Sequence, residues 1–303
     1  MQPLDATPDN VSEAPRAIEA IVTAVKTLEG GGFPVRRPFP TAARTAVDPF
    51  LLLDHLGPVS WGPGEAIGAP DHPHRGFETV TYLLAGQMRH KDSQGHQGNL
   101  GPGDVQWMTA GAGVVHSELP AAEFQRNGGV MHGLQIWVNL PARAKMIPPR
   151  YQEIPAAQIP QAATPDGRVT VRVIAGEALG QSAVIDTHTP IIYLHYTLQP
   201  GGRAVQAIPR DHNALVYVIA GSVVLGPEAT AVHEGQMAIL GSGDTIDLAT
   251  AANANGATDL IVMTGVPLRE PVARYGPFVM NTEAEIQQAI RDYRQGRMGR
   301  IQT

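Results

Sequence analysis

Four residues in the first half of the chain have the types and the spacing of metal ligands. His72 and His74 lie two positions apart, and His116 and Glu118 repeat that spacing. Because side chains alternate across a β-strand, residues two apart on one strand point to the same side. Three neutral imidazoles and one carboxylate form a ligand set that suits a divalent transition metal such as iron, manganese, nickel, copper or zinc. The spacing therefore predicts a mononuclear metal site.

The segment between the two pairs must bring them together in space. Turn signals occur at Ala85-Gly86, within 92–95 and within 101–104. Short runs rich in β-branched and aromatic residues, such as 79–84, separate these turns and are typical of strands. The pattern predicts a β-meander that folds one ligand pair against the other.

The same residues also resemble a known family. Cupin barrels have two signature motifs. The HxH motif followed by a glutamate and a glycine resembles the first, and the later motif that contains His116 resembles the second. Longer segments resemble those of the pirin family within that superfamily: Asp48–His55, His72–Val80, Gly103–Gly111, His116–Glu118 and Gly133–Pro141. The resemblance runs from about Ala20 to Gly299 and is densest between Val47 and Tyr151.

The resemblance implies an all-β chain of two tandem, jelly-roll-like cupin barrels with a short C-terminal helix. It also implies one divalent metal ion, iron first, with manganese, nickel, copper, cobalt or zinc as alternatives. Some members of the family cleave flavonols such as quercetin with dioxygen, whereas the animal member is a nuclear, iron-dependent transcription co-regulator. Two functions from different classes therefore remain open. One is a dioxygenase acting on a small planar aromatic substrate, and the other is a metal-dependent regulator or redox sensor that binds a protein partner.

Two glutamates compete for the carboxylate role. In many cupins a glutamate at the position of Glu78 is a ligand, and on an unbroken strand Glu78 would share a face with His74. The pirin pattern places the carboxylate ligand in the word that ends at Glu118. We therefore assign Glu118 to the metal and Glu78 to a supporting position, where it orients a histidine by a hydrogen bond. In the enzyme hypothesis, Glu118 or Glu78 accepts the proton of the substrate hydroxyl.

Simpler readings of the histidines also exist. An isolated HxH is often a pair of ordinary surface histidines, and a closed structural zinc site is a further alternative. Structural zinc sites mostly use cysteine, and the chain contains none. A shell of three histidines and one carboxylate more naturally leaves exchangeable positions on the ion, where a chelating substrate or dioxygen can bind. His55 and His132 fit buried, hydrogen-bonded histidines or pocket lining better than ligands.

Composition sets limits on the fold and on partners. The chain has 303 residues, enough for two cores, with 43% hydrophobic and 17% charged residues, which argues against disorder. The 33 glycines and 26 prolines favour many short strands joined by turns over long helices. A net charge of −6 gives no electrostatic footprint for nucleic acid. The absence of cysteine excludes disulfides and thiol chemistry.

The start of the chain carries no targeting signal that we can identify. Residues 1–16 are polar and contain three prolines, which predicts a flexible leader. Asp5, Asp9 and Glu13 do not fit a signal peptide, and no run of about 18 apolar residues could span a membrane. We therefore expect a cytoplasmic protein.

The remaining patterns divide the chain into two barrels. A strand is expected over 20–28, a buried strand over 50–53, and a Pro/Gly-rich loop over 57–70 that forms part of a pocket rim. Pro148-Pro149 marks the connection between halves, so we expect a metal-binding barrel over 17–148 and a second barrel over 149–303.

The second half resembles the first as a repeat that has lost most of the ligand residues. Residues 211–221 can be laid over 71–86 as a repeat, but only His212 remains of the ligands, and Ala214 occupies the position of a second histidine. The second barrel is therefore expected to be structural, with a degenerate site. Near the end, apolar residues between Ile286 and Tyr293 recur at helical spacing, and Thr282 with Glu285 predicts a capping box that starts a terminal helix.

Overall fold

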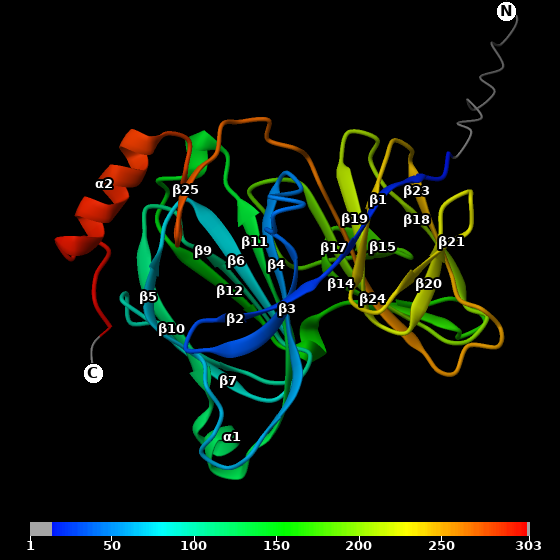
Figure 1. Cartoon of the computed structure of the whole chain (residues 1–303), viewed down its shortest axis with the longest axis horizontal. Helices are drawn as coiled ribbons and strands as arrows, with labels where there is room; N and C mark the ends of the chain where they lie inside the picture. The colour runs from blue at the N-terminus through cyan, green and yellow to red at the C-terminus, as the bar shows by residue number, and fades with distance from the viewer. Residues whose placement is uncertain (1–13, 302–303) are drawn as a thin grey trace, which may run out of the picture.

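The fold consists of two β-barrels that pack against each other through their larger sheets (Figure 1). This computed structural model describes residues 14–301. Most of the expected leader lies outside the described residues. Its last described part is packed: Arg16 is buried and donates hydrogen bonds to the carbonyl oxygens of Gly243, His212 and Pro209.

The first barrel is built from a seven-stranded and a four-stranded antiparallel sheet. The larger sheet contains, in spatial order, β12 (Arg150–Ile154), β9 (Val105–Thr109), β6 (Phe77–Ala85), β11 (Gly129–Asn139), β4 (Phe50–Trp61), β3 (Phe33–Phe39) and β2 (Val25–Glu29). The smaller sheet contains β5 (Ala69–His74), β10 (Val114–Pro120), β7 (Met88–Asp92) and β8 (Gln97–Leu100). The expected buried strand at 50–53 continues eight residues further as β4, so the expected rim loop begins only after Trp61.

The second barrel repeats this plan. Its larger sheet contains β1 (Ile18–Thr23), β22 (Gln236–Leu240), β19 (Asn213–Ala220), β24 (Thr258–Gly265), β17 (Ile191–Leu198), β14 (Val169–Ala175) and β13 (Gln161–Ala163). Its smaller sheet contains β18 (Arg203–Ala207), β23 (Thr245–Ala249), β20 (Ser222–Leu225) and β21 (Thr230–His233). Two short hairpins complete the strands: β15 (Glu177–Ala178) with β16 (Gln181–Ser182), and β25 (Ala273–Tyr275) with β26 (Phe278–Met280).

The hydrophobic core that joins the barrels lies between the two larger sheets. Tyr82 and Trp107 from the first barrel and Tyr193 and Tyr217 from the second are fully buried in one continuous cluster. Strand β6 alternates between this cluster and the interior of its own barrel, which explains why nearly all of its side chains are buried. The expected all-β fold of two tandem barrels with a short C-terminal helix is confirmed.

Sheet pairing crosses the expected domain boundaries at both ends of the chain. The strand expected over 20–28 is divided at Ala24. Its first part, β1, pairs with β22 of the second barrel, and its second part, β2, pairs with β3 of the first. In the opposite direction, β12 follows Pro148-Pro149 but pairs with β9 of the first barrel. Each barrel therefore has a strand that the sequence order assigns to the other.

The C-terminal segment packs on the first barrel. Helix α2 (Glu283–Arg294) begins at Thr282 with the expected capping box, and Ile286 and Ala289 are buried against Val115 of β10. Figure 1 shows α2 beside β5 and β25, at the end of the molecule farthest from β21. Helix α1 (Ala122–Asn127), which the sequence patterns did not predict, lies in the loop between β10 and β11.

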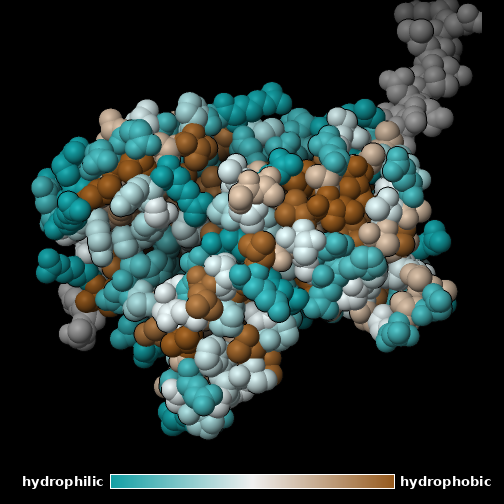
Figure 2. All heavy atoms as spheres, in the orientation of Figure 1, coloured by the Kyte–Doolittle hydropathy of each residue, from teal (hydrophilic) through white to brown (hydrophobic). Residues whose placement is uncertain are grey.

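The described surface is mixed in character. Figure 2 shows polar side chains over most of one face, with a hydrophobic patch where Figure 1 places β1 and β19. Neither of the two α-helices of the described chain has the length and apolar character needed to cross a membrane.

Candidate metal centre

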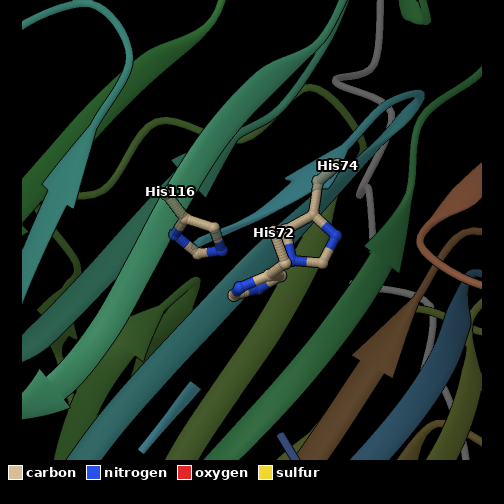
Figure 3. A group of neighbouring side chains, drawn as sticks. All are labelled: His72, His74 and His116. Carbon is tan, nitrogen blue, oxygen red and sulfur yellow. The ribbon is translucent and has the colours of Figure 1, made fainter. Parts of the chain in front are cut away.

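Three histidines meet because two strands of the smaller sheet are paired in register. β5 and β10 run antiparallel, with His72 directly opposite His116 and His74 opposite Val114. The ring centroids of the three imidazoles lie 4.4 to 4.9 Å apart, and one nitrogen from each lies within 4.8 Å of the others. Figure 3 shows the rings converging from the two strands. We call His72, His74 and His116 the three-histidine cluster.

The nitrogen atoms of the cluster fit a metal ion. The Nδ1 atom of His72 lies 2.7 Å from the carbonyl oxygen of Pro70, which can only accept, so Nδ1 carries the proton and the Nε2 lone pair is free. The Nδ1 atom of His74 and both ring nitrogens of His116 are buried without a hydrogen-bond partner. Buried polar atoms of this kind are costly unless something binds them. A divalent cation would bind one nitrogen of each ring and so offset part of this cost.

Burial also keeps the histidines in the form that binds metal. Burial, opposed in part by the carboxylate of Glu118, lowers the pKa of the His116 imidazole to about 4. Burial and the neighbouring imidazoles of His116 and His72 lower the pKa of His74 well below its usual value. Neutral imidazole is the ligand form, so His74 and His116 need not lose a proton to a metal at neutral pH.

Glu118 lies beside the cluster but is held by other groups. Its Oε1 accepts a 2.9 Å hydrogen bond from Thr81 Oγ1, and its Oε2 accepts one of 2.9 Å from Gln135 Nε2. Burial alone raises the pKa of Glu118, but the nearby His116 and His72 and the two hydrogen bonds outweigh that effect, so its pKa is below the usual value. The carboxylate is therefore ionised at neutral pH.

A local irregularity separates Glu118 from the three nitrogens. Among the described residues, the ligand atoms that gather within 4.8 Å come from the three-histidine cluster, and Glu118 is not one of them. The register of β5 and β10 shifts between His116 and Glu118, with an extra residue on β5, and such bulges redirect nearby side chains. Each carboxylate oxygen keeps a further lone pair beyond its hydrogen bond. The metal-binding role of Glu118 stays a prediction.

Glu78 lies on a different face. β5 ends at His74 and β6 begins at Phe77, so the unbroken strand on which the parity argument depended is interrupted at Gly76. On β6, the side chain of Glu78 points to the face opposite to that of Thr79 and Thr81. Its Oε1 accepts a 2.6 Å hydrogen bond from Thr109 Oγ1. Burial raises the pKa of Glu78 to about 7, against the lowering effect of the Thr109 hydrogen bond. Its face is that of Val80, which belongs to the core between the barrels.

A cavity opens beside the three-histidine cluster. It has a volume of about 460 Å³, and its wall includes Phe33, Glu118, Gln135, Trp137 and Arg274 together with His72 and His74. Pro70, at the end of the expected rim loop, also lines it. A smaller apolar cavity of about 30 Å³ adjoins it and shares Phe33, Ala69, Glu118 and Gln135. A small planar molecule could therefore enter the barrel next to the cluster.

Sequence patterns alone did not identify several residues of this wall. Thr81 on β6 and Gln135 on β11 hold Glu118, but no spacing rule connects either of them with Glu118. Trp137 was noted only as part of the segment Gly133–Pro141 that resembles the pirin family, but its ring lies 5.3 Å from that of His74. The period-2 alternation of β11, which places Gln135 and Trp137 on one face, is the one signal that could have linked them.

Hydrogen bonds hold three further histidines, His55, His132 and His212. His55 Nε2 lies 2.7 Å from His132 Nε2, and His55 Nδ1 lies 2.9 Å from the Tyr217 hydroxyl, as expected for buried, hydrogen-bonded histidines. In the second barrel, His212 Nδ1 lies 2.8 Å from Thr264 Oγ1. Within residues 14–301, the three-histidine cluster is the only group found with three potential ligands.

Comparison with known proteins identifies the family. The family model described as Pirin matches residues 32–138, and that described as Pirin C-terminal cupin domain matches residues 193–299. The chain belongs to the pirin family. It is 43% identical to a pirin-like protein from Solanum lycopersicum, over 96% of this chain and 95% of that protein. It is 44% identical to human Pirin, over 89% of this chain and 90% of that protein.

A solved structure extends the likeness to three dimensions. A crystal structure described as quercetin 2,3-dioxygenase from Acinetobacter baumannii superimposes with a TM-score of 0.88 at 40% sequence identity. The match covers 95% of this chain and 100% of that one. This pirin therefore shares its two-barrel architecture with a protein that carries an enzyme's name.

Proposed function

We propose that this pirin is a metal-dependent dioxygenase that cleaves quercetin-type flavonols with dioxygen. The observation that carries the proposal is the three-histidine cluster, with its unpartnered buried nitrogens, at the wall of a cavity large enough for a planar aromatic molecule. The likeness to the Acinetobacter quercetin 2,3-dioxygenase supports the choice of reaction and substrate class.

The three-histidine cluster and Glu118 are the proposed metal ligands. When bound, the metal supplies open coordination positions for the flavonol hydroxyl and ketone oxygens and lowers the pKa of that hydroxyl. Iron is the ion that we propose, and elemental analysis of protein purified without chelator or nickel affinity distinguishes it from manganese, nickel, copper, cobalt and zinc.

Of the two carboxylates, Glu118 is the better placed proton acceptor in this proposal. Its carboxylate lines the cavity, where a substrate hydroxyl can reach it, and its pKa below the usual value keeps it ionised and free to accept a proton, although the same shift makes it a weaker base than Glu78. Thr81 and Gln135 fix its position. Glu78 is less suited because it faces the core between the barrels and accepts a hydrogen bond from Thr109. The deprotonated flavonol then reacts with dioxygen, and its ring opens with loss of carbon monoxide.

The test measures dioxygen uptake and loss of flavonol absorbance by metal-replete protein. We expect both signals, and we expect His74→Ala to lose metal and both signals together. His233 lies exposed on β21 of the second barrel, so His233→Ala is a matched control that should keep metal content and rate.

The alternative is a metal-dependent interaction protein without turnover, and the presence of human Pirin among the relatives keeps this class in view. If fully metal-loaded protein consumes neither dioxygen nor flavonol, while His74→Ala loses metal and partner binding, the dioxygenase proposal fails and the interaction role replaces it.

A further inference from the structure

Arg274 carries a positive charge from the C-terminal segment to the mouth of the first barrel's cavity. It lies on β25, exposed, and it lines the same cavity as His72 and His74. Its guanidinium carbon lies 4.7 Å above the centre of the Trp137 ring. The same indole ring lies 5.3 Å from the imidazole ring of His74. Trp137 therefore contacts both the Arg274 guanidinium and the three-histidine cluster.

The other arginine in the cavity wall is already neutralised. Arg37 donates from Nε and Nη2 to the two carboxylate oxygens of Asp54, at 2.6 and 2.5 Å, and also pairs with Glu29. These two carboxylates are thus engaged. Arg37 therefore has little remaining capacity to bind an anionic ligand.

Arg274 has no such partner among the described residues. No carboxylate of the described chain lies within 4.0 Å of it, and the only hydrogen bond found for its side chain is a long one, from Nη1 to the Leu51 carbonyl oxygen at 3.4 Å. A guanidinium has five N–H donors in a planar fork. The contact with the Trp137 ring holds the guanidinium at the cavity wall without neutralising its charge.

The remaining charges of the wall make Arg274 decisive for a negatively charged ligand. Asp71 and Glu118 line the cavity as carboxylates, and both repel an anion. Arg274 is the one cation of the described wall that is not paired with a carboxylate. Without it, the protein groups around the cavity would oppose binding of an anion.

We propose that Arg274 binds an anionic group of the substrate, so that the cavity selects planar aromatic molecules with a chelating oxygen pair at one end and an ionised carboxylate or phenolate at the other. This inference rests on the proposed metal site, because the chelating end needs an ion at the three-histidine cluster. The planar fork of Arg274 suits a carboxylate, which it can bind through two parallel hydrogen bonds.

The test compares two ligands that differ in one charge. 3-Hydroxyflavone and its 4′-carboxylate share the chelating oxygens, and only the second has an anionic group at the far ring. Binding to iron-loaded protein is measured by fluorescence titration without dioxygen, so no turnover is needed. We expect the native protein to bind the carboxylate about tenfold more tightly, the effect of one charge-assisted hydrogen-bond contact.

Three variants separate charge from packing. Arg274→Met keeps an unbranched stem over Trp137 without the charge, and the preference for the carboxylate should disappear or reverse. Arg274→Lys keeps the charge without the fork, and part of the preference should remain. Arg203 lies exposed on β18 of the second barrel, so Arg203→Gln removes one positive charge elsewhere and should leave the preference unchanged.

The outcomes of this test are distinguishable from failure of the proposed function. A native protein that prefers the carboxylate but never consumes dioxygen loses the dioxygenase role and keeps this inference. Equal affinity of the native protein for both ligands, or an unchanged preference in Arg274→Met, overturns the inference even when turnover persists. Should Arg274→Met fail to fold, Arg274→Lys decides, because complete loss of preference there shows that charge at this position is not what selects the ligand.

Discussion

Arg75 donates a 2.8 Å hydrogen bond from Nη1 to Oδ2 of Asp292, which joins the residue after His74 to the C-terminal helix. Both side chains are buried, with 6% and 10% of their surface exposed. The Nε atom of Arg75 donates a second hydrogen bond, of 2.6 Å, to the Ala112 carbonyl oxygen in the turn before β10. One guanidinium thus connects both strands of the three-histidine cluster to α2.

This ion pair predicts a large effect of a conservative substitution. Asp292→Asn removes the negative charge and leaves the buried Arg75 guanidinium without a counter-charge, so the free energy of unfolding should fall by about 3 kcal/mol or more. Urea unfolding of metal-free protein measures this. Metal affinity should fall as well, because the ion pair that fixes the end of β5 to α2 is lost. Arg297→Gln is the matched control: Arg297 binds the same carboxylate from a 58% exposed position, and its loss should cost less than about 1 kcal/mol. Equal losses in the two variants would contradict the prediction.

The two glutamates can be separated by charge-removing substitutions of equal size. Glu118→Gln should reduce metal affinity and abolish flavonol turnover, because the carboxylate at the cavity is gone. Glu78→Gln should retain both, since an amide oxygen can still accept the hydrogen bond from Thr109. Metal content by elemental analysis and dioxygen uptake check the pair. A loss of turnover in Glu78→Gln with metal retained would move the proton acceptor to the core face of β6.

The core between the barrels should make metal-free protein sensitive to acid. Burial, with Arg36 and His132 nearby, lowers the pKa of His55 to about 2, whereas in the unfolded chain a histidine titrates near 6.5. Between these pH values His55 binds a proton in the unfolded state but not in the folded state. The contribution of His55 to the free energy of unfolding is therefore fully present above about pH 6.5 and decreases as the pH falls. At pH 5 the loss from His55 alone should be about 2 kcal/mol. Denaturant unfolding from pH 8 to pH 4.5 measures it, and His55→Gln should give a shallower acid limb. An equally steep limb in that variant would show that other groups cause the acid sensitivity.

The turn after His74 should tolerate no side chain beyond hydrogen. Gly76 has φ +87°, and a Cβ there would lie 2.0 Å from the Val279 carbonyl oxygen of β26. Gly95 has a similar φ of +92° but open space around it. Gly95→Ala should therefore cost only the backbone strain of about 1–2 kcal/mol, whereas Gly76→Ala should cost more and weaken metal binding. Thermal unfolding and metal titration of both variants provide the comparison. Similar melting temperatures would mean that β26 moves aside without cost.

The sequence predicted correctly that the three histidines meet. His72, His74 and His116 could be grouped because strand alternation is a local rule, and antiparallel pairing of β5 with β10 turns two local words into one cluster. The rule failed for Glu78, where it counted through Gly76. Where a glycine with positive φ interrupts a strand, the alternation of side chains before it does not continue after it. The amino-acid composition does not indicate which face the following residues take.

Contacts between residues distant in sequence could not be predicted from local patterns. The division into barrels followed chain order, but β1 pairs with β22 and β12 with β9, because hydrogen-bonding partners are chosen by the completed sheets. Arg274 could not be assigned to the cavity for the same reason. Its nearest aromatic contact, Trp137, lies far away in the sequence, and nothing in either segment marks the other.

The dependence of the first barrel on α2 also orders events during biosynthesis. Translation delivers His72, His74 and His116 well before Asp292 and the segment that packs behind Arg75. A nascent chain therefore exposes these imidazoles before the segment that holds β5 in place has been made. We expect stable metal binding at the three-histidine cluster to follow the synthesis of α2.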